Sequence, residues 1–160
     1  MRIRIGSGYD IHRLVEGRKL RLGGYTLPEQ SLGLLGHSDA DVLLHAVIDA
    51  LLGALALGDI GMWFSDRDLQ WKDADSAMLL QAVLTAPQLQ GWQLINLDST
   101  IIAQKPQLQN HIPAIRQSLA ALFGCNREQV SVKAKTNEGL DAIGCGQAMA
   151  AHVVLLLCHG

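Results

Sequence analysis

The segment from Gly36 to Asp68 constrains the fold most strongly, because it places ionisable side chains within an otherwise apolar stretch. Only 18% of the chain is charged, yet seven ionisable residues fall within or beside this run of Leu, Ala, Val and Ile. They are His37, Asp39, Asp41, His45, Asp49, Asp59 and Asp66. Burying carboxylates and imidazoles is costly unless they are paired, hydrogen-bonded or bound to metal. The segment therefore predicts a functional centre, and a metal site is the most economical interpretation.

An apolar helix is predicted to begin after Ser38 and to end at Gly58. Ser38 is a good N-cap residue, and Asp41 three positions later completes a capping-box pattern. Asp41, His45 and Asp49 are spaced four apart, so they lie on one face of the helix. A metal-bound histidine usually donates its second N–H to a carboxylate or carbonyl. Asp41 or Asp49 is therefore expected to orient His45.

A second set of possible metal ligands lies near the start of the chain. Arg2 to Ile5 alternates as a strand does, and Asp10 and His12 follow shortly after it. In an extended chain, Asp10 and His12 point to the same side. With His45 they form a set of two imidazoles and one carboxylate, which suits zinc with an open fourth position. The alternative is that both histidines are ordinary interior residues, and the local spacing alone does not decide between the two interpretations.

Two turns carry further groups that can bind a ligand. Asp59 lies in the glycine-bracketed turn Gly58 to Gly61, where it either ends a helix or accepts ribose hydroxyls. The loop Lys135 to Glu138 combines a cation, a hydroxyl and a carboxylate, which could hold a phosphate and a hard divalent metal, or could be an ordinary polar turn. Gly6-Ser7-Gly8 lacks the third glycine and the helix of a dinucleotide-binding fingerprint, so we exclude that site.

The remaining pattern predicts one α+β domain over residues 1–160. A hairpin with a two-residue turn is expected at 20–27, followed by a loop at 29–36. Helices are expected at 76–86 and 111–123, and strands at 92–103, 130–134 and 147–158. Because strands and helices are interleaved, the expected architecture is a mixed sheet with helices packed on one face.

Composition narrows the class of function. Hydrophobic residues make up 49% of the chain, which favours an oligomer over a lone monomer. A net charge of −2 argues against nucleic-acid binding, and no apolar run is long enough to span a membrane. The start of the chain lacks the apolar core of a signal peptide. Three cysteines without Cys-x-x-Cys spacing indicate a reducing compartment, either bacterial cytoplasm or, after removal of a transit peptide, plastid stroma.

Several motifs stand in a characteristic order and spacing. They are Gly8-Tyr9-Asp10-Ile11-His12, Gly36-His37-Ser38-Asp39-Ala40-Asp41-Val42 with His45, Gly58-Asp59-Ile60-Gly61, Asp66 and Lys135-Thr136-Asn137-Glu138. Together they resemble the 2-C-methyl-D-erythritol 2,4-cyclodiphosphate synthases of the non-mevalonate isoprenoid pathway. The similarity runs from about Ile3 to the last predicted strand, so it covers nearly the whole chain.

The resemblance implies the cyclisation of 4-diphosphocytidyl-2-C-methyl-D-erythritol 2-phosphate. The 2-phosphate attacks the β-phosphorus of the diphosphate, which forms a cyclic diphosphate and releases CMP. Because the nucleophile is already an anion, the protein's task is electrostatic and metal-assisted stabilisation of the crowded phosphorus. A zinc-dependent phosphohydrolase and a binding protein for isoprenoid diphosphates with a structural metal are the alternatives.

The resemblance also implies a role for each matching residue. Asp10, His12 and His45 would hold zinc, and Glu138 would hold a second cation, Mg²⁺ or Mn²⁺. His37 and Thr136 would stabilise the transition state. The substrate-binding residues would be Asp10, Ile11, His12, His37, Ser38, Asp59, Ile60, Gly61, Phe64, Ser65, Asp66, Arg67, Asp68, Ala103, Gln104, Lys105, Pro106, Gln107, Leu108, Lys135, Thr136, Asn137 and Glu138. In this set, Asp59 and Gly61 would bind ribose, residues 64–68 would line the methylerythritol pocket, and the backbone of residues 103–108 would form the cytosine pocket.

Three positions depart from the resembling enzymes. Cys145 stands where many of them carry Arg, Gln107 where many carry Lys, and Ala142 where an aromatic residue is frequent. Nucleotide affinity is therefore expected to be built differently, with Lys105 or Lys135 in compensation. The resemblance further implies a homotrimer with its sheets around a three-fold axis and its three sites between neighbouring subunits.

Overall fold

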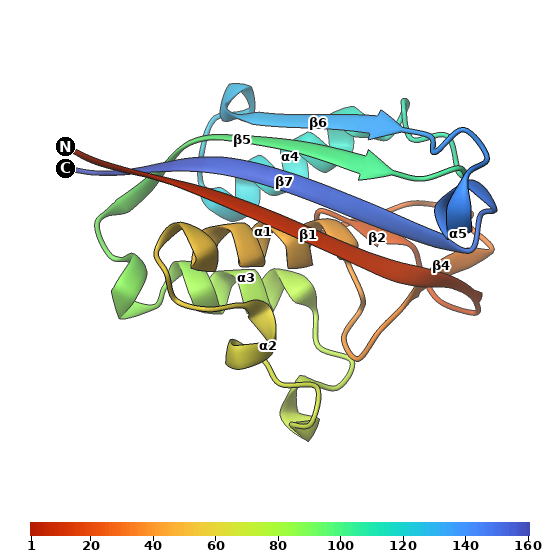
Figure 1. Ribbon diagram of the computed structural model, residues 1–160, viewed down its shortest axis with the longest axis horizontal. Coiled ribbons are helices and arrows are strands. Elements are labelled where there is room, and N and C mark those ends of the chain that lie inside the picture. The colour runs from red at the N-terminus through yellow and green to blue at the C-terminus, as the bar shows by residue number, and fades with distance from the viewer.

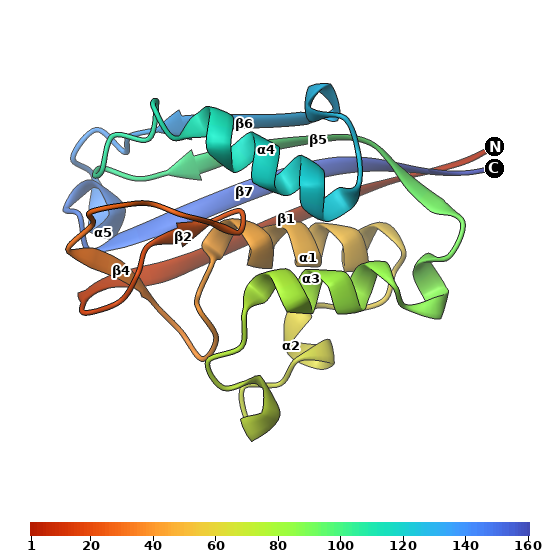
Figure 2. The same ribbon diagram turned by 180° about the vertical axis from the view of Figure 1, so that it is seen from behind.

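The computed structural model describes residues 1–160 as a five-stranded mixed sheet whose longer helices lie on one face, as predicted, while the short helix Asp141–Gly144 packs on the other (Figures 1 and 2). The strands are β1 (Arg2–Glu16), β4 (Leu32–Leu35), β5 (Trp92–Ile102), β6 (Val130–Lys135) and β7 (Ala148–His159). Their order is β4-β1-β7-β5-β6, and only β5 and β6 run parallel. A separate hairpin joins β2 (Arg21–Leu22) to β3 (Tyr25–Thr26). This arrangement confirms the predicted α+β class.

The helical layer rests on the sheet through two helices. The helices are α1 (Val42–Ala54), α2 (Ile60–Trp63), α3 (Ser76–Leu84), α4 (Ile112–Phe123) and α5 (Asp141–Gly144), with 3-10 turns at Leu69–Trp71, Pro87–Leu89 and Arg127–Gln129. Helix α1 packs on β1 and β7, while α4 packs on β6 and α3 lies outside α1 (Figure 2). None of the helices has the length and apolarity that crossing a bilayer requires.

Most predicted elements are confirmed within a few residues, because their end signals are local. Asp75 caps α3 by accepting the N–H of Ala77, and Gly124 ends α4 in a left-handed conformation. The sequence did not predict the short helices α2 and α5, nor strand β4, which lies in a stretch that we predicted to be a loop. Strand β4 forms by pairing with the far end of β1, where Arg13 faces Leu35, and such a partner leaves no local signature.

The start of α1 differs from the prediction. Its N-cap is Asp41, whose carboxylate accepts the N–H of Leu44 at 3.0 Å, whereas the hydroxyl of Ser38 faces His45 instead. Ala40 has a φ of +58°, which is incompatible with a helix beginning at Ser38. The helix ends at Ala54, four residues before the predicted stop at Gly58. The capping box is therefore wrong, although the helix itself is confirmed.

Asp41 also fixes the hairpin to the helix. Its side chain is fully buried and accepts the N–H groups of Gly23 at 2.9 Å and Gly24 at 2.7 Å. Burial raises the pKa of Asp41, and the three backbone donors oppose that rise. One carboxylate thus joins the two-residue turn of the hairpin to the first turn of α1.

Gly6 and Gly8 allow strand β1 to pass directly beneath α1. A Cβ on Gly8 would lie 1.9 Å from the carbonyl oxygen of Ala46, and one on Gly6 would lie 1.8 Å from that of Ala50. No side chain fits at either position, so the two glycines set the distance between the strand and the helix. The Gly6-Ser7-Gly8 sequence therefore allows close packing of the strand on the helix, and it does not form a nucleotide-binding turn.

The face of β1 opposite the helices is apolar and uncovered. Ile3, Ile5, Tyr9 and Ile11 are between 44% and 69% exposed, and they occupy alternate positions of the strand. The neighbouring strand β7 contributes half-buried Val154, Leu156 and Cys158 to the same face. Contiguous apolar surface of this kind marks an interaction site more often than it marks a free surface.

Candidate metal centre and substrate site

Two adjacent elements bring the three predicted metal ligands together. Asp10 and His12 come from β1, and His45 comes from the α1 turn that lies over the strand. Oδ2 of Asp10 lies 2.8 Å from Nε2 of His12 and 3.0 Å from Nδ1 of His45, and the two nitrogens are 3.0 Å apart. These three atoms form a nearly equilateral triangle, so a single ion can contact all of them. The prediction that the ligands converge is confirmed.

Hydrogen bonds to the outer atoms of the ligands leave their inner atoms free. Nδ1 of His12 donates to the carbonyl of Leu35 at 2.9 Å, which turns Nε2 toward the triangle and, in the neutral ring, leaves its lone pair there. Oδ1 of Asp10 accepts the N–H of Ile11 at 2.9 Å, which leaves Oδ2 for the triangle. Without a metal, the ring nitrogens that face Oδ2 of Asp10 can donate protons to it, and a bound cation would replace those protons. The donor set therefore fits a metal ion.

The charges within the triangle reinforce each other. Burial alone would raise the pKa of Asp10, but its hydrogen bonds to His12 and His45 outweigh burial and lower that pKa to about 2. Burial lowers the pKa of His12, but its hydrogen bond and charge interaction with Asp10 raise that pKa overall. The carboxylate is therefore ionised at neutral pH and ready to act as a ligand.

The two carboxylates predicted to orient His45 accept hydrogen bonds from backbone N–H groups instead. Asp41 is engaged by the hairpin and the helix cap, and Asp49 accepts the N–H of Ile60 at 2.8 Å. Nε2 of His45 instead lies 3.0 Å from the hydroxyls of both Ser38 and Ser76. The prediction failed because it considered only neighbours along the helix, whereas the serines come from other segments.

A cavity of about 220 Å³ opens onto the triangle. Besides the three ligands it is lined by predicted substrate residues, namely His37, Ser38, Ile60, Gly61, Phe64 and Asp66. Gly36, Trp71 and Leu79 also line it, and sequence reasoning did not identify them. Trp71 meets Phe64 edge to face, with ring centroids 5.0 Å apart, so the two rings form one wall of the cavity. In the sequence, only the aromatic character of Trp71 could have indicated that it lines the site.

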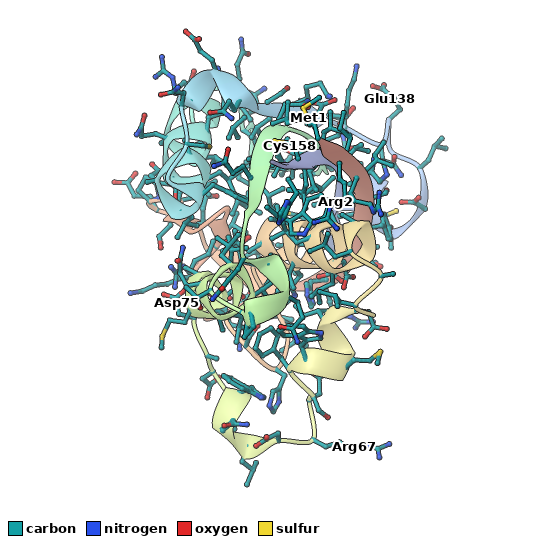
Figure 3. All side chains as sticks on the ribbon, turned by 90° about the vertical axis from the view of Figure 1, so that its left-hand side faces the viewer. Met1, Arg2, Arg67, Asp75, Glu138 and Cys158 are labelled. Carbon is teal, nitrogen blue, oxygen red and sulfur yellow. The ribbon has the colours of Figure 1, made fainter.

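The predicted ribose and methylerythritol residues lie in two short turns beside this cavity. Asp59 begins α2 by accepting the N–H of Met62 at 2.9 Å, so the alternative that it ends the preceding helix is wrong, since α1 stops at Ala54. Nε2 of His37 lies 3.4 Å from the carbonyl oxygen of Asp68, so the segment before α1 contacts the turn at residues 64–68. Arg67, between Phe64 and Asp68, projects away from the body of the molecule (Figure 3).

The predicted phosphate and cytosine loops form a separate group at the ends of two parallel strands. The ends of β5 and β6 are paired, with Ile102 facing Lys135, so the loops that follow them are adjacent. They share a cavity of about 250 Å³, lined by Ala103, Gln104, Pro106, Gln107, Leu108, Gln109, Ala134, Lys135 and Thr136. Oγ1 of Thr136 donates to Oε1 of Glu138 at 2.8 Å. Glu138 is exposed and lies far from Arg67 in Figure 3.

The two groups do not meet within one chain. No residue lines both the metal cavity and the cavity of the phosphate loop. Lys105 and Cys145 line a third cavity of about 640 Å³, together with Gln104 and Gln107. Asn137 donates to Asp141 at 2.7 Å and so shapes the loop rather than facing a cavity. Within a single chain, the predicted site residues therefore fall into two separate groups.

Comparison with known proteins identifies the relatives of this chain. The model of the YgbB family matches residues 3–158. Curated 2-C-methyl-D-erythritol 2,4-cyclodiphosphate synthases from Gloeobacter violaceus and Neisseria gonorrhoeae are 57% and 55% identical to it. Both alignments cover 97% of this chain, and they cover 94% and 96% of those proteins respectively.

Solved structures agree with the sequence comparison. A CDP-bound 2C-methyl-D-erythritol-2,4-cyclodiphosphate synthase superposes with a TM-score of 0.87 at 37% identity, covering 97% of this chain and 100% of that one. The CDP complex of IspF from Plasmodium falciparum gives 0.84 at 33% identity, covering 98% and 96%. The resemblance predicted from the motifs is confirmed over almost the entire chain. The protein therefore belongs to the YgbB family, alongside the 2-C-methyl-D-erythritol 2,4-cyclodiphosphate synthases.

Proposed function

We infer that the chain is a 2-C-methyl-D-erythritol 2,4-cyclodiphosphate synthase, a lyase of isoprenoid precursor biosynthesis. It closes 4-diphosphocytidyl-2-C-methyl-D-erythritol 2-phosphate into the cyclic diphosphate and releases CMP. The observation that carries this inference is the triangle of Asp10, His12 and His45. The triangle opens into the same cavity as His37 and Ser38, in a chain that matches these synthases along its length.

The triangle suits zinc among the common metals. Asp10, His12 and His45 would hold the ion, because two imidazoles and one carboxylate are a ligand set that catalytic zinc accepts. When bound there, the ion supplies Lewis-acid polarisation of the β-phosphate. Glu138, held by Thr136 on an exposed loop, is proposed to bind a second and harder cation, Mg²⁺ or Mn²⁺.

The chain's own side chains bind and orient the reacting groups. His37 and Ser38 at the cavity mouth would hold the 2-phosphate against the β-phosphorus, and Thr136 would donate to the oxygens that gain charge. Holding two anions in contact converts a repulsive encounter into an oriented intramolecular step. Residues 103–108 would bind the cytosine through their backbone, and Asp59 the ribose, which keeps CMP in place until its bond to the β-phosphorus breaks.

We further propose that the working form is a homotrimer with shared sites. The metal cavity and the phosphate loop lie on different parts of one chain, so a second copy is needed to complete each site. The uncovered apolar face that carries Ile5 and Tyr9 provides the surface on which three sheets would pack. A closed three-fold arrangement would repeat one interface three times. The two CDP complexes support a nucleotide at each site.

Complementation between inactive variants tests the shared site. His45→Ala should lose the metal half, and Glu138→Ala should lose the phosphate half. Each variant should be inactive alone, while trimers refolded from a mixture should regain turnover at interfaces that pair two intact halves. Mixed trimers that form but never turn over would refute shared sites. A monomer in sedimentation at working concentration would refute the trimer as well.

Product analysis separates the proposed activity from its alternatives. The synthase yields the cyclic diphosphate and CMP in equal amounts. A zinc-dependent phosphohydrolase, which would use the open metal position for water, yields inorganic phosphate instead, and a binding protein yields no product. Because all three cysteines are free, we expect a reducing compartment such as bacterial cytoplasm or plastid stroma.

A further inference from the structure

A chain of hydrogen bonds extends outward from His45, on the side away from the metal triangle. Its Nε2 lies 3.0 Å from the hydroxyl of Ser76, and that hydroxyl donates to Oδ1 of Asp39 in a short hydrogen bond. Oδ2 of Asp39 accepts the N–H of Ser76 at 3.2 Å, and it pairs with Arg21 at 3.1 Å. Arg21 in turn contacts Asp75 at 3.0 Å. The network therefore links α1, the start of α3 and the β2–β3 hairpin.

Donor counting within this network fixes the position of one proton. The carboxylate of Asp39 only accepts hydrogen bonds, and it takes the single hydroxyl hydrogen of Ser76. The oxygen of Ser76 can then act toward His45 only as an acceptor. The hydrogen between them must be carried by Nε2 of His45, so in the neutral ring that binds a metal the lone pair lies on Nδ1. That lone pair points at Asp10 and His12.

Ser38 does not fix this proton by itself. Its hydroxyl also lies 3.0 Å from Nε2 of His45 and accepts the N–H of Ala40 at 3.1 Å. Because its own hydrogen is not engaged by a carboxylate, Ser38 could either donate to the ring or accept from it. Ser76 differs only in being tied to Asp39, and it is completely buried. Ser76 is therefore the member of the pair that determines the tautomer.

We propose that Ser76 and Asp39 are positioning residues that select the tautomer of His45 and so present Nδ1 to a metal ion. This inference rests on the proposed metal site. Arg21 supplies the positive charge that balances Asp39 in its half-buried setting. Outer partners of this type typically change metal affinity by about 10- to 100-fold. Ser76 contacts only the outer nitrogen of His45, and Asp39 contacts none of the three ligands, so their effect acts only through His45.

Zinc affinity, measured by competition with a chromophoric chelator, tests the proposal without any need for turnover. Ser76→Ala should weaken zinc binding about 10- to 100-fold. Asp39→Asn should weaken it in the same direction, because an amide can donate to Ser76 and reverse the hydrogen bond to His45. Ser99→Ala is the matched control: Ser99 is equally buried and donates to the carbonyl of Ser131 at 2.9 Å, away from the metal cavity. It should leave zinc affinity unchanged.

Nitrogen chemical shifts of the His45 ring in the zinc-loaded protein provide the second measurement. The wild-type ring should show a protonated Nε2 and a metal-bound Nδ1, and the signal of the Nε2 proton should broaden by solvent exchange in Ser76→Ala. Equal zinc affinity in the wild type and both variants, or zinc on Nε2, overturns the tautomer selection alone. A wild-type chain that binds no zinc overturns the metal site and this inference together.

Discussion

Replacing Gly8 by alanine should separate the metal ligands without altering any of them. A Cβ at Gly8 would lie 1.9 Å from the carbonyl oxygen of Ala46, whereas a relaxed carbon–oxygen contact is about 3.3 Å or longer. Strand β1 and helix α1 must therefore move apart locally by roughly 1.4 Å. Because His45 precedes Ala46 on the helix while Asp10 and His12 lie on the strand, the whole shift falls on the metal triangle.

Both the site and the fold should respond to that shift. The triangle has sides of 2.8 to 3.0 Å, and a functional site tolerates displacements of only about 0.5 Å. Gly8→Ala should lose His45 as a ligand and weaken zinc binding by at least about 100-fold, beyond the usual effect of an outer partner. Overpacking at the crossing should also lower the free energy of unfolding by about 1–3 kcal/mol.

The same substitution elsewhere in the crossing region provides the control. Gly53 lies in α1, and its nearest neighbour would be the carbonyl oxygen of Ser7, 3.9 Å from an added Cβ, which is an ordinary contact. Gly53→Ala should keep zinc affinity and raise the free energy of unfolding by up to about 1 kcal/mol, because alanine favours the helix. Urea denaturation and chelator competition measure both quantities. If Gly8→Ala binds zinc as the wild type does, the close approach does not set the site.

Three further perturbations have defined outcomes. Asp41→Ala should lower the free energy of unfolding by about 2–4 kcal/mol in urea denaturation, because the N–H groups of Gly23, Gly24 and Leu44 would lose their hydrogen-bond acceptor. A loss below about 0.5 kcal/mol would contradict this expectation. In metal-free protein, the stability difference between wild type and Asp10→Asn should be largest between about pH 4 and 6.5. The lowered pKa of Asp10 means that its contribution fades as pH falls from 3.8 toward about 2, and the raised pKa of His12 means that it fades above 6.5; a pH-independent difference would refute the pairing. Glu138→Gln should weaken activation by Mg²⁺ or Mn²⁺ while leaving zinc affinity intact, and unchanged activation at full turnover would show that another group holds the second cation.

The parts of the site that local spacing controls were predictable from the sequence. Asp10 and His12 share a side because strand residues alternate, and this alternation needs no knowledge of the rest of the fold. Residue spacing alone did not predict that this pair would lie close to His45. Only the family resemblance predicted it. Helices α3 and α4 were found because Asp75 and Gly124 carry their end signals within one turn.

The parts that depend on distant partners were missed. Asp41 looked like half of a capping box, but its carboxylate meets hairpin N–H groups 17 and 18 residues earlier in the chain. Ser76 lies 31 residues from His45, and β4 exists only because the far end of β1 pairs with it. Each of these features requires the chain to be folded before its partner is near. Propensity and periodicity describe the few residues around a position and therefore could not reveal them.

Successive side chains of β1 point to opposite faces of the sheet, so the two faces have separate roles and each can be changed without the other. Even-numbered positions carry the helix-facing glycines and the ligands Asp10 and His12, while the odd-numbered positions from Ile3 to Ile11 form the uncovered face. An engineer could therefore rewrite the odd positions with charged residues to change assembly without replacing a ligand. An insertion of one residue within the strand would exchange the two sets and destroy both at once. The same constraint applies in evolution. Substitutions on the uncovered face of this strand are tolerated, whereas insertions and deletions within it are not.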